Sequence, residues 1–300
     1  MNRCPPLHGV HVPLVTPFAA DGDVAEEALE GLAHGVLDAG AAGIVALGTT
    51  GEAATLDADE KRAVVDVCAR VCAARGAALT IGAGGNDTRA GARVLADLAA
   101  RWPTAAAALV PVPYFTRPGQ AGVRAHFARL ASASPLPLIV YHIPYRTGQA
   151  LDAAGLRELA RIPGVVGVKL ATGGIDQEAV DLLGDLPPDF TVLAGDDLFL
   201  SPLLALGAAG GILASAHLAT GRFVELADAW RDGDPARARD LGHALARMSA
   251  AAFGEPNPTV IKGVLHAQGR IPTPDVRLPL LPARRPSIDA TLKCLADLGA

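Results

Sequence analysis

The feature that most constrains the fold is a short apolar run followed by a helix-like amphipathic pattern, repeated along the chain. Short apolar runs bounded by turn residues are typical of buried strands, whereas apolar residues at helical spacing predict a helix packed on a sheet. The predicted strands cover residues 10–16, 43–47, 78–82, 105–110, 137–141, 164–170, 190–194 and 210–213. The predicted helices cover 26–39, a segment from about 58, 89–101, 122–131, 152–160, 175–183 and 198–206. The sequence therefore predicts an α/β fold.

Eight successive strand–helix units favour a closed (β/α)8 barrel over an open doubly wound sheet. Residues after 219 change in character, since several helical segments follow one another without a strand between them. Those segments are 223–230, 235–252, 259–267 and 288–298. We therefore predict the barrel over residues 1–219 and a C-terminal helical extension over residues 220–300 that packs on it.

Charge and hydropathy exclude several kinds of partner. The formal net charge is −5, and no basic run interleaved with aromatic residues occurs, which argues against nucleic acid as a partner. No apolar run reaches the length of about 18 residues that a membrane span needs. The N-terminus lacks an apolar segment of signal-peptide length, so we expect a cytoplasmic protein.

Neither a metal nor an organic cofactor is expected. Cys68 and Cys72 lie one helical turn apart, but no second ligand pair accompanies them, so small buried apolar residues are the favoured interpretation. The glycine-rich segment 82–85 follows a strand, yet it matches neither the dinucleotide fingerprint nor the P-loop pattern. The chemistry must then come from side chains.

The predicted strand 164–170 delivers Lys169 at its C-terminal end, where barrel enzymes place their active sites. Burying an ammonium is costly, so this lysine should be solvated, paired or deprotonated. A deprotonated amine can attack a ketone and form a Schiff base. Tyr141 ends the preceding strand, and a phenol beside the amine can relay protons. Each residue alone has an ordinary structural explanation, but the pair predicts imine chemistry.

A glycine–threonine turn follows the second predicted strand. Backbone N–H groups of the segment Gly48, Thr49, Thr50 and Gly51 can hold a carboxylate, although such a turn after a strand is often only a turn. With Lys169, this arrangement favours a 2-oxo acid as substrate.

Motifs along nearly the whole chain resemble one known family. They are GTTGEAATL at 48–56, PYFTRPGQ at 113–120, VYHIPYRTG at 140–148, GVKLATG at 167–173, AGDD at 194–197, EPNPTVIKG at 255–263 and RLPLLP at 277–282. In order and spacing these segments are similar to the pyruvate-dependent class I lyases typified by dihydrodipicolinate synthase and N-acetylneuraminate lyase. The resemblance implies a (β/α)8 barrel and a lysine Schiff base.

The resemblance also implies roles for matched positions. Lys169 forms the imine with pyruvate, while Tyr141 and Thr49 relay protons. Thr49 and Thr50 bind the pyruvate carboxylate, Gly48 is a further substrate contact, and Arg146 binds the carboxylate of an acceptor such as aspartate semialdehyde. Leu213 and Phe115 complete the predicted substrate contacts. A homo-oligomer, a tetramer built as a dimer of dimers, is expected.

Three departures from the synthase pattern leave the acceptor open. Phe115 replaces a second tyrosine of the loop, His142 stands where asparagine is frequent, and Leu170 stands where glutamate is frequent. A lyase that condenses pyruvate with aspartate semialdehyde is the first hypothesis. An aldolase or dehydratase for a 2-keto-3-deoxy sugar acid is the second, and a non-catalytic barrel is the third.

Overall fold

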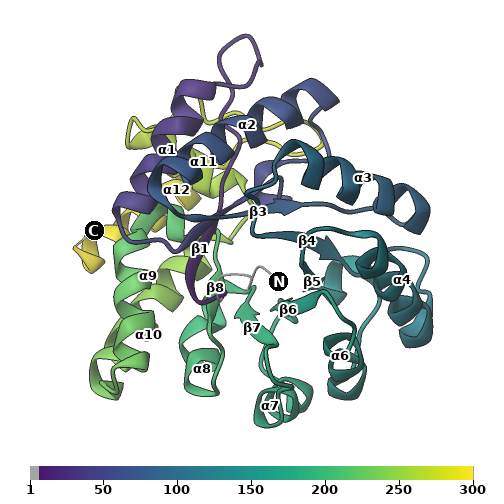
Figure 1. The fold of residues 1–300 in the computed structure, drawn as a ribbon. Helices are drawn as coiled ribbons and strands as arrows, with labels where there is room; N and C mark the ends of the chain where they lie inside the picture. Colours follow the sequence, from purple (N-terminus) through teal and green to yellow (C-terminus); the bar gives the residue numbers. More distant parts are fainter. Residues whose placement is uncertain (1–6, 300) are drawn as a thin grey trace. The chain divides into compact units, whose positions relative to one another are not determined.

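The computed structural model describes residues 7–299, and its eight parallel strands pair in sequence order and close into a barrel (Figure 1). The strands are β1 (Gly9–Pro13), β2 (Gly43–Ala46), β3 (Ala78–Gly82), β4 (Ala107–Pro111), β5 (Leu138–His142), β6 (Val165–Leu170), β7 (Thr191–Ala194) and β8 (Gly210–Ile212). The predicted barrel is confirmed. Each strand is short and almost wholly buried, as parallel strands covered on both faces require.

Two compact units make up the chain. Among the described residues, one contains residues 7–8 and Thr80–Gly211, and the other contains Gly9–Leu79 and residues 212–299. The predicted boundary at residue 219 stays a prediction. Ala219 itself lies inside α9 (Ala216–Arg231), where its non-helical φ of −146° marks a kink.

The first unit contains the helices that follow β3 to β7 in the chain. They are α3 (Thr88–Arg101), α4 (Gly119–Ala133), α5 (Pro144–Thr147), α6 (Ala153–Ala160), α7 (Gln177–Gly184) and α8 (Leu200–Ala205), with the short 3₁₀ helix η2 (Asp197–Phe199) before α8. Helix α4 packs on α3 and α6, and α6 packs on α7. Asp87, Asp152 and Asp176 begin α3, α6 and α7 by accepting backbone N–H bonds. These caps fix where the loops after the strands end.

In the second unit α1 (Glu26–Asp38) packs on α2 (Ala58–Arg75). The C-terminal helices α9, α10 (Pro235–Ala252), α11 (Thr259–Ala267) and α12 (Arg285–Leu298) pack in the pairs α9–α10, α10–α12 and α11–α12 (Figure 1). Asp57 and Glu60 form the capping box predicted at the start of α2.

Within residues 7–299 no helix combines the length and the apolar character that a membrane crossing requires. The same range holds no cluster of three or more His, Cys, Asp or Glu residues placed to bind a metal ion.

Cys68 and Cys72 are buried, and burial raises the pKa of Cys72 to about 12. The signal-peptide expectation rests largely on residues 1–6, which lie outside the described residues.

Candidate active site

Adjacent strands of the first unit bring Tyr141 and Lys169 side by side. The two residues are register partners in the β5–β6 pair. Lys169 Nζ lies 4.4 Å from the centroid of the Tyr141 ring. Both side chains are buried. The two residues predicted to share imine chemistry therefore meet in the barrel wall.

Burial changes the acidity of Lys169. Desolvation is the largest influence and lowers its pKa to about 8, with a smaller contribution from the positive charge of Arg146. The carboxylates of Asp197 and Asp196 act in the opposite sense. At neutral pH about a tenth of the amine is then unprotonated, far more than for an ordinary lysine. Such an amine is a competent nucleophile.

This acidity predicts the pH dependence of imine formation. The amine attacks only when unprotonated, so the rate with pyruvate should rise with pH and level off above about pH 8. A lysine of ordinary pKa would give a rate that rises until about pH 10. Borohydride trapping at short reaction times, across this pH range, measures the rate. A midpoint near pH 10 would contradict the lowered pKa.

The end of β7 contributes two acids to the surroundings of Lys169. Asp196 Oδ2 accepts a 2.7 Å hydrogen bond from the backbone N–H of Gly173, and burial raises the pKa of Asp196. Gly195 has no space for a side chain, since a Cβ would lie 2.9 Å from Lys169 Cγ and 2.8 Å from Ala171 Cβ. Gly195 therefore packs directly against the lysine stem. The sequence placed Gly195 and Asp196 at this end of the barrel but gave them no role.

Arg146 lies on α5, the short helix that follows β5. Its guanidinium carbon is 5.8 Å from the centroid of the Tyr145 ring, and its charge lowers the pKa values of both Lys169 and Asp196. The Tyr145 side chain is largely exposed. Partial burial raises its pKa, the negative charge of Asp196 raises it further, and Arg146 acts in the opposite sense. The charge of an exposed cation thus acts on the buried amine. Tyr145 was missed by the sequence analysis, although it directly precedes Arg146.

Phe115 points into solvent in this structure. Its side chain is 91% exposed, and its φ of +67° lies in the left-handed region that non-glycine residues rarely adopt. The backbone N–H donates a 3.0 Å bond to the carbonyl of Thr147, and Asn86 holds the preceding Tyr114 through two bonds to its backbone. These hydrogen bonds fix the backbone at Tyr114 and Phe115, while the phenyl ring of Phe115 stays exposed. Its predicted substrate contact stays a prediction.

In the second unit the segment after β2 forms the 3₁₀ helix η1 (Thr49–Gly51). Thr49 is exposed, whereas Thr50 is buried and its Oγ1 accepts a 3.0 Å bond from Asn257 Nδ2. The carbonyl of Gly51 accepts a 2.8 Å bond from Thr16 Oγ1. Since its acceptor side is occupied by Asn257, the Thr50 hydroxyl can direct its proton toward an anion.

Leu213 follows β8 in the second unit. Its backbone N–H donates a 3.0 Å bond to the carbonyl of His11, which continues the strand pairing. The side chain is fully buried. Leu213 is therefore part of the barrel core, and a substrate contact through it stays a prediction.

A buried ion pair behind η1 was missed by the sequence analysis. Glu52 ends the turn with a φ of +53°, and its Oε1 accepts a 2.8 Å bond from Lys262 Nζ. Lys262 also donates to the carbonyl of Thr16 at 2.9 Å and lies 4.0 Å from the Phe18 ring centroid. Burial lowers the pKa of Lys262, against which the charge of Glu52 acts. The pair ties the turn to α11.

A second cation completes the surroundings of Glu52. The backbone N–H of Arg277 donates a 2.8 Å bond to Glu52 Oε2, and the Arg277 guanidinium pairs with Glu60. That guanidinium lowers the pKa of Glu60. Both carboxylate oxygens of Glu52 are thus satisfied, as a buried charge requires. The sequence signal for this network was that Glu52, Lys262 and Arg277 fall inside three of the quoted motifs.

A sequence model described as the Dihydrodipicolinate synthetase family matches residues 6–296. The 4-hydroxy-tetrahydrodipicolinate synthase of Nitratidesulfovibrio vulgaris is 39% identical over 279 residues, which are 92% of this chain and 93% of that protein. The enzyme of that name from Synechococcus elongatus is 36% identical over 98% of this chain and 97% of its own length.

Solved structures agree with these sequence relatives. The dihydrodipicolinate synthase of Thermotoga maritima has a TM-score of 0.93 at 29% identity and covers 98% of this chain and 99% of its own. The Acinetobacter baumannii enzyme, solved in complex with pyruvate, has a TM-score of 0.91 at 35% identity, with 98% and 99% coverage. From the matched residues, the relatives and the barrel with its buried lysine, we conclude that this chain belongs to the dihydrodipicolinate synthetase family.

Proposed function

We propose that this protein is a lyase that condenses pyruvate with aspartate 4-semialdehyde through an imine on Lys169, giving 4-hydroxy-tetrahydrodipicolinate. The observation that supports it most is the buried amine of Lys169, whose pKa is about 8, packed on the Tyr141 ring. The names of the relatives support the same activity.

The proposed reaction begins at the unprotonated amine. Lys169 Nζ adds to the C2 carbonyl carbon of pyruvate, and a water molecule leaves once the carbinolamine hydroxyl has been protonated. The imine nitrogen draws electrons from the methyl group, which loses a proton and becomes an enamine carbon. That carbon attacks the aldehyde carbon of the acceptor, whose oxygen takes a proton. We assign the proton transfers to the Tyr141 hydroxyl, because its ring lies against the amine.

Release from the lysine follows from the chemistry of the acceptor. The amino group of aspartate semialdehyde reaches the imine carbon within the condensed product. It replaces Lys169 Nζ there and closes a six-membered ring. The amine of Lys169 is then free for another pyruvate.

Two groups are proposed to hold carboxylates. The Thr50 hydroxyl and the N–H groups of the Thr49–Gly51 turn take the pyruvate carboxylate, and Arg146 takes that of the acceptor. Thr49 is proposed to join the proton relay.

Arg146→Ala should raise the KM for aspartate semialdehyde by about tenfold to a hundredfold, since charged hydrogen bonds contribute about 1.5–3 kcal/mol. The KM for pyruvate should change much less. Steady-state kinetics with each substrate varied in turn measures both constants. Arg129→Ala, at an exposed position on α4, is the matched control. An unchanged acceptor KM would show that the acceptor carboxylate is held elsewhere.

A second candidate keeps the imine but takes another acceptor, such as a 2-keto-3-deoxy sugar acid. The observation in its favour is Phe115, which lacks the hydroxyl of the family's tyrosine. Its ring is exposed and offers no polar partner to a water that could replace that hydroxyl.

Phe115→Tyr separates the two candidates. If the native acceptor is not aspartate semialdehyde, we expect this substitution to raise kcat for pyruvate plus aspartate semialdehyde by about tenfold or more. The reason is that the exposed side chain at this position is proposed to reach the active site of a neighbouring subunit, where a hydroxyl would restore a proton relay. Coupled assay of the purified variant and the unmodified protein measures the gain. A neutral substitution in a protein that already runs this reaction at high rate favours the first candidate.

Product analysis decides the proposed function directly. The protein is incubated with pyruvate and each of a panel of aldehydes, and the products are identified by mass spectrometry. We expect turnover with aspartate semialdehyde to exceed turnover with sugar-derived aldehydes.

We also propose a cytoplasmic homo-oligomer built as a dimer of dimers. Light scattering of the purified protein measures the mass of the assembly and so tests the tetramer. One structural relative is described as a monomeric variant.

A further inference from the structure

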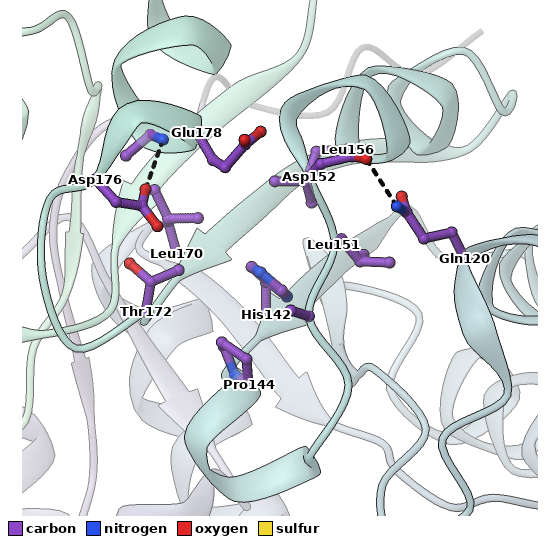
Figure 2. A pocket seen from close by; sticks show the side chains of 12 residues that line it. Gln120, His142, Pro144, Leu151, Asp152, Leu156, Leu170, Thr172, Asp176 and Glu178 are labelled. Carbon is purple, nitrogen blue, oxygen red and sulfur yellow. Dashed lines mark hydrogen bonds between the residues drawn. The ribbon is translucent and has the colours of Figure 1, made fainter.

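A pocket of about 320 Å³ lies beside the ends of β5 and β6, lined also by α6 and α7 (Figure 2). Its lining includes His142 and Leu170, which directly follow Tyr141 and Lys169 and are themselves register partners. Successive side chains of a strand point to opposite faces. The pocket is therefore on the reverse side of the two strands that carry the amine and the phenol, and it is distinct from the imine site.

His142 is the unexplained group in this pocket. Its side chain is only 2% exposed, and Nδ1 has no hydrogen-bond partner among residues 7–299. Burial lowers its pKa to about 4, so the imidazole is neutral at physiological pH. A buried polar atom without a partner costs about 1–3 kcal/mol. Figure 2 shows the ring facing the pocket, where a ligand can supply that partner.

The rim of the pocket is acidic. Asp152, Asp176 and Glu178 line it, and no lysine or arginine of the described chain does. Asp176 Oδ1 accepts from the N–H of Ala179, and Glu178 Oε2 accepts from the N–H of Ala153. Each keeps a second oxygen that has no such bond within residues 7–299. The N-termini of α6 and α7 offset only about half a charge each, so the rim stays negative and repels anions.

Most of the remaining wall is apolar, apart from the polar side chains of Gln120 and Thr172. Leu151, Leu156 and Leu170 are buried and line it together with Ala179. A wall of this kind favours an apolar body in the ligand. The volume is at the lower end of the range for small-molecule sites, about 300–1,000 Å³.

We propose that this pocket binds a small organic cation, with an apolar body against the leucines, a hydrogen bond to His142 and an ammonium group between Asp176 and Glu178. The site is separate from the imine chemistry and does not depend on the identity of the acceptor aldehyde. It requires only the pocket that the first unit forms by itself.

Benzylamine is a suitable probe, since it is protonated at neutral pH and has a compact apolar ring. Isothermal titration of the full-length protein, without pyruvate, should give saturable binding with one site per chain. Benzyl alcohol, which has no charge, should bind several-fold more weakly, and benzoate should not bind. Absence of benzylamine binding, or equal binding of benzoate, would overturn the proposal.

Variants locate the binding. The double variant Asp176→Asn with Glu178→Gln removes two charges. Each new amide keeps one oxygen that can accept the backbone hydrogen bond, and asparagine caps helices about as well as aspartate. It should raise the Kd of benzylamine about threefold to tenfold. Asp189→Asn, an exposed charge change outside the pocket, should leave it unchanged. Equal Kd values for the double variant and this control would contradict the site.

His142→Leu tests the proposed hydrogen bond between the ligand and the buried imidazole. Loss of the imidazole should weaken benzylamine about tenfold, because the ligand loses its buried hydrogen bond. The melting temperature, measured by circular dichroism, shows whether the variant stays folded. If it does not, the rim double variant decides the proposal, because its helix caps are kept.

Discussion

Lys169→Arg should lower kcat for the condensation by at least about a thousandfold while the barrel stays folded. Arginine keeps a positive charge, but its guanidinium remains protonated and cannot attack a ketone. The loss corresponds to about 4 kcal/mol of transition-state free energy. Steady-state assay of the variant, with circular dichroism to check its fold, makes the measurement.

Lys293→Arg is the matched control, since the same exchange at an exposed position of α12 should leave kcat unchanged. If Lys169→Arg retained turnover near that of the control, no imine on Lys169 could be part of the reaction.

Lys262→Met should lower the free energy of unfolding by about 3–5 kcal/mol, since it leaves the Glu52 carboxylate buried without its cation. Lys262 is fully buried and makes two hydrogen bonds, so no solvent can replace it. Because Glu52 ends the turn that carries Thr50, the KM for pyruvate should rise as well. Urea unfolding gives the stability, and initial rates with pyruvate varied give the KM.

A double variant separates the charge from the packing. Lys262→Met combined with Glu52→Gln removes both charges and should recover part of the lost stability. Lys293→Met, at an exposed site, should change stability by no more than about 0.5 kcal/mol. If Lys262→Met were as harmless as Lys293→Met, the ion pair would not hold the turn.

The sequence predicted the barrel well because each strand–helix unit is encoded locally. The predicted strand 164–170 agrees closely with β6 (Val165–Leu170), and the predicted helix 235–252 agrees with α10 (Pro235–Ala252). Boundaries differ where local patterns are weak. Helix α5 (Pro144–Thr147) lies between the predicted strand 137–141 and the predicted helix 152–160, where no helix was predicted, since four residues are too few for a helical period.

The site was predictable only in part. Tyr141 and Lys169 end successive strands, so the barrel pattern alone makes them neighbours. Glu52 and Lys262 are 210 positions apart, and nothing local to either segment indicates that they pair. In the sequence His142 was notable only as a departure from the synthase pattern, and only the packing of α6 and α7 gives it a pocket.

Reductive trapping tests the central claim most directly. The protein is incubated with pyruvate, reduced with borohydride and digested, and each lysine-containing peptide is examined by mass spectrometry. The chain has four lysines, Lys61, Lys169, Lys262 and Lys293, so the other three serve as internal controls. We predict the mass of a reduced pyruvate adduct on Lys169 alone. An unmodified Lys169, or an adduct spread over the other lysines, would contradict the account.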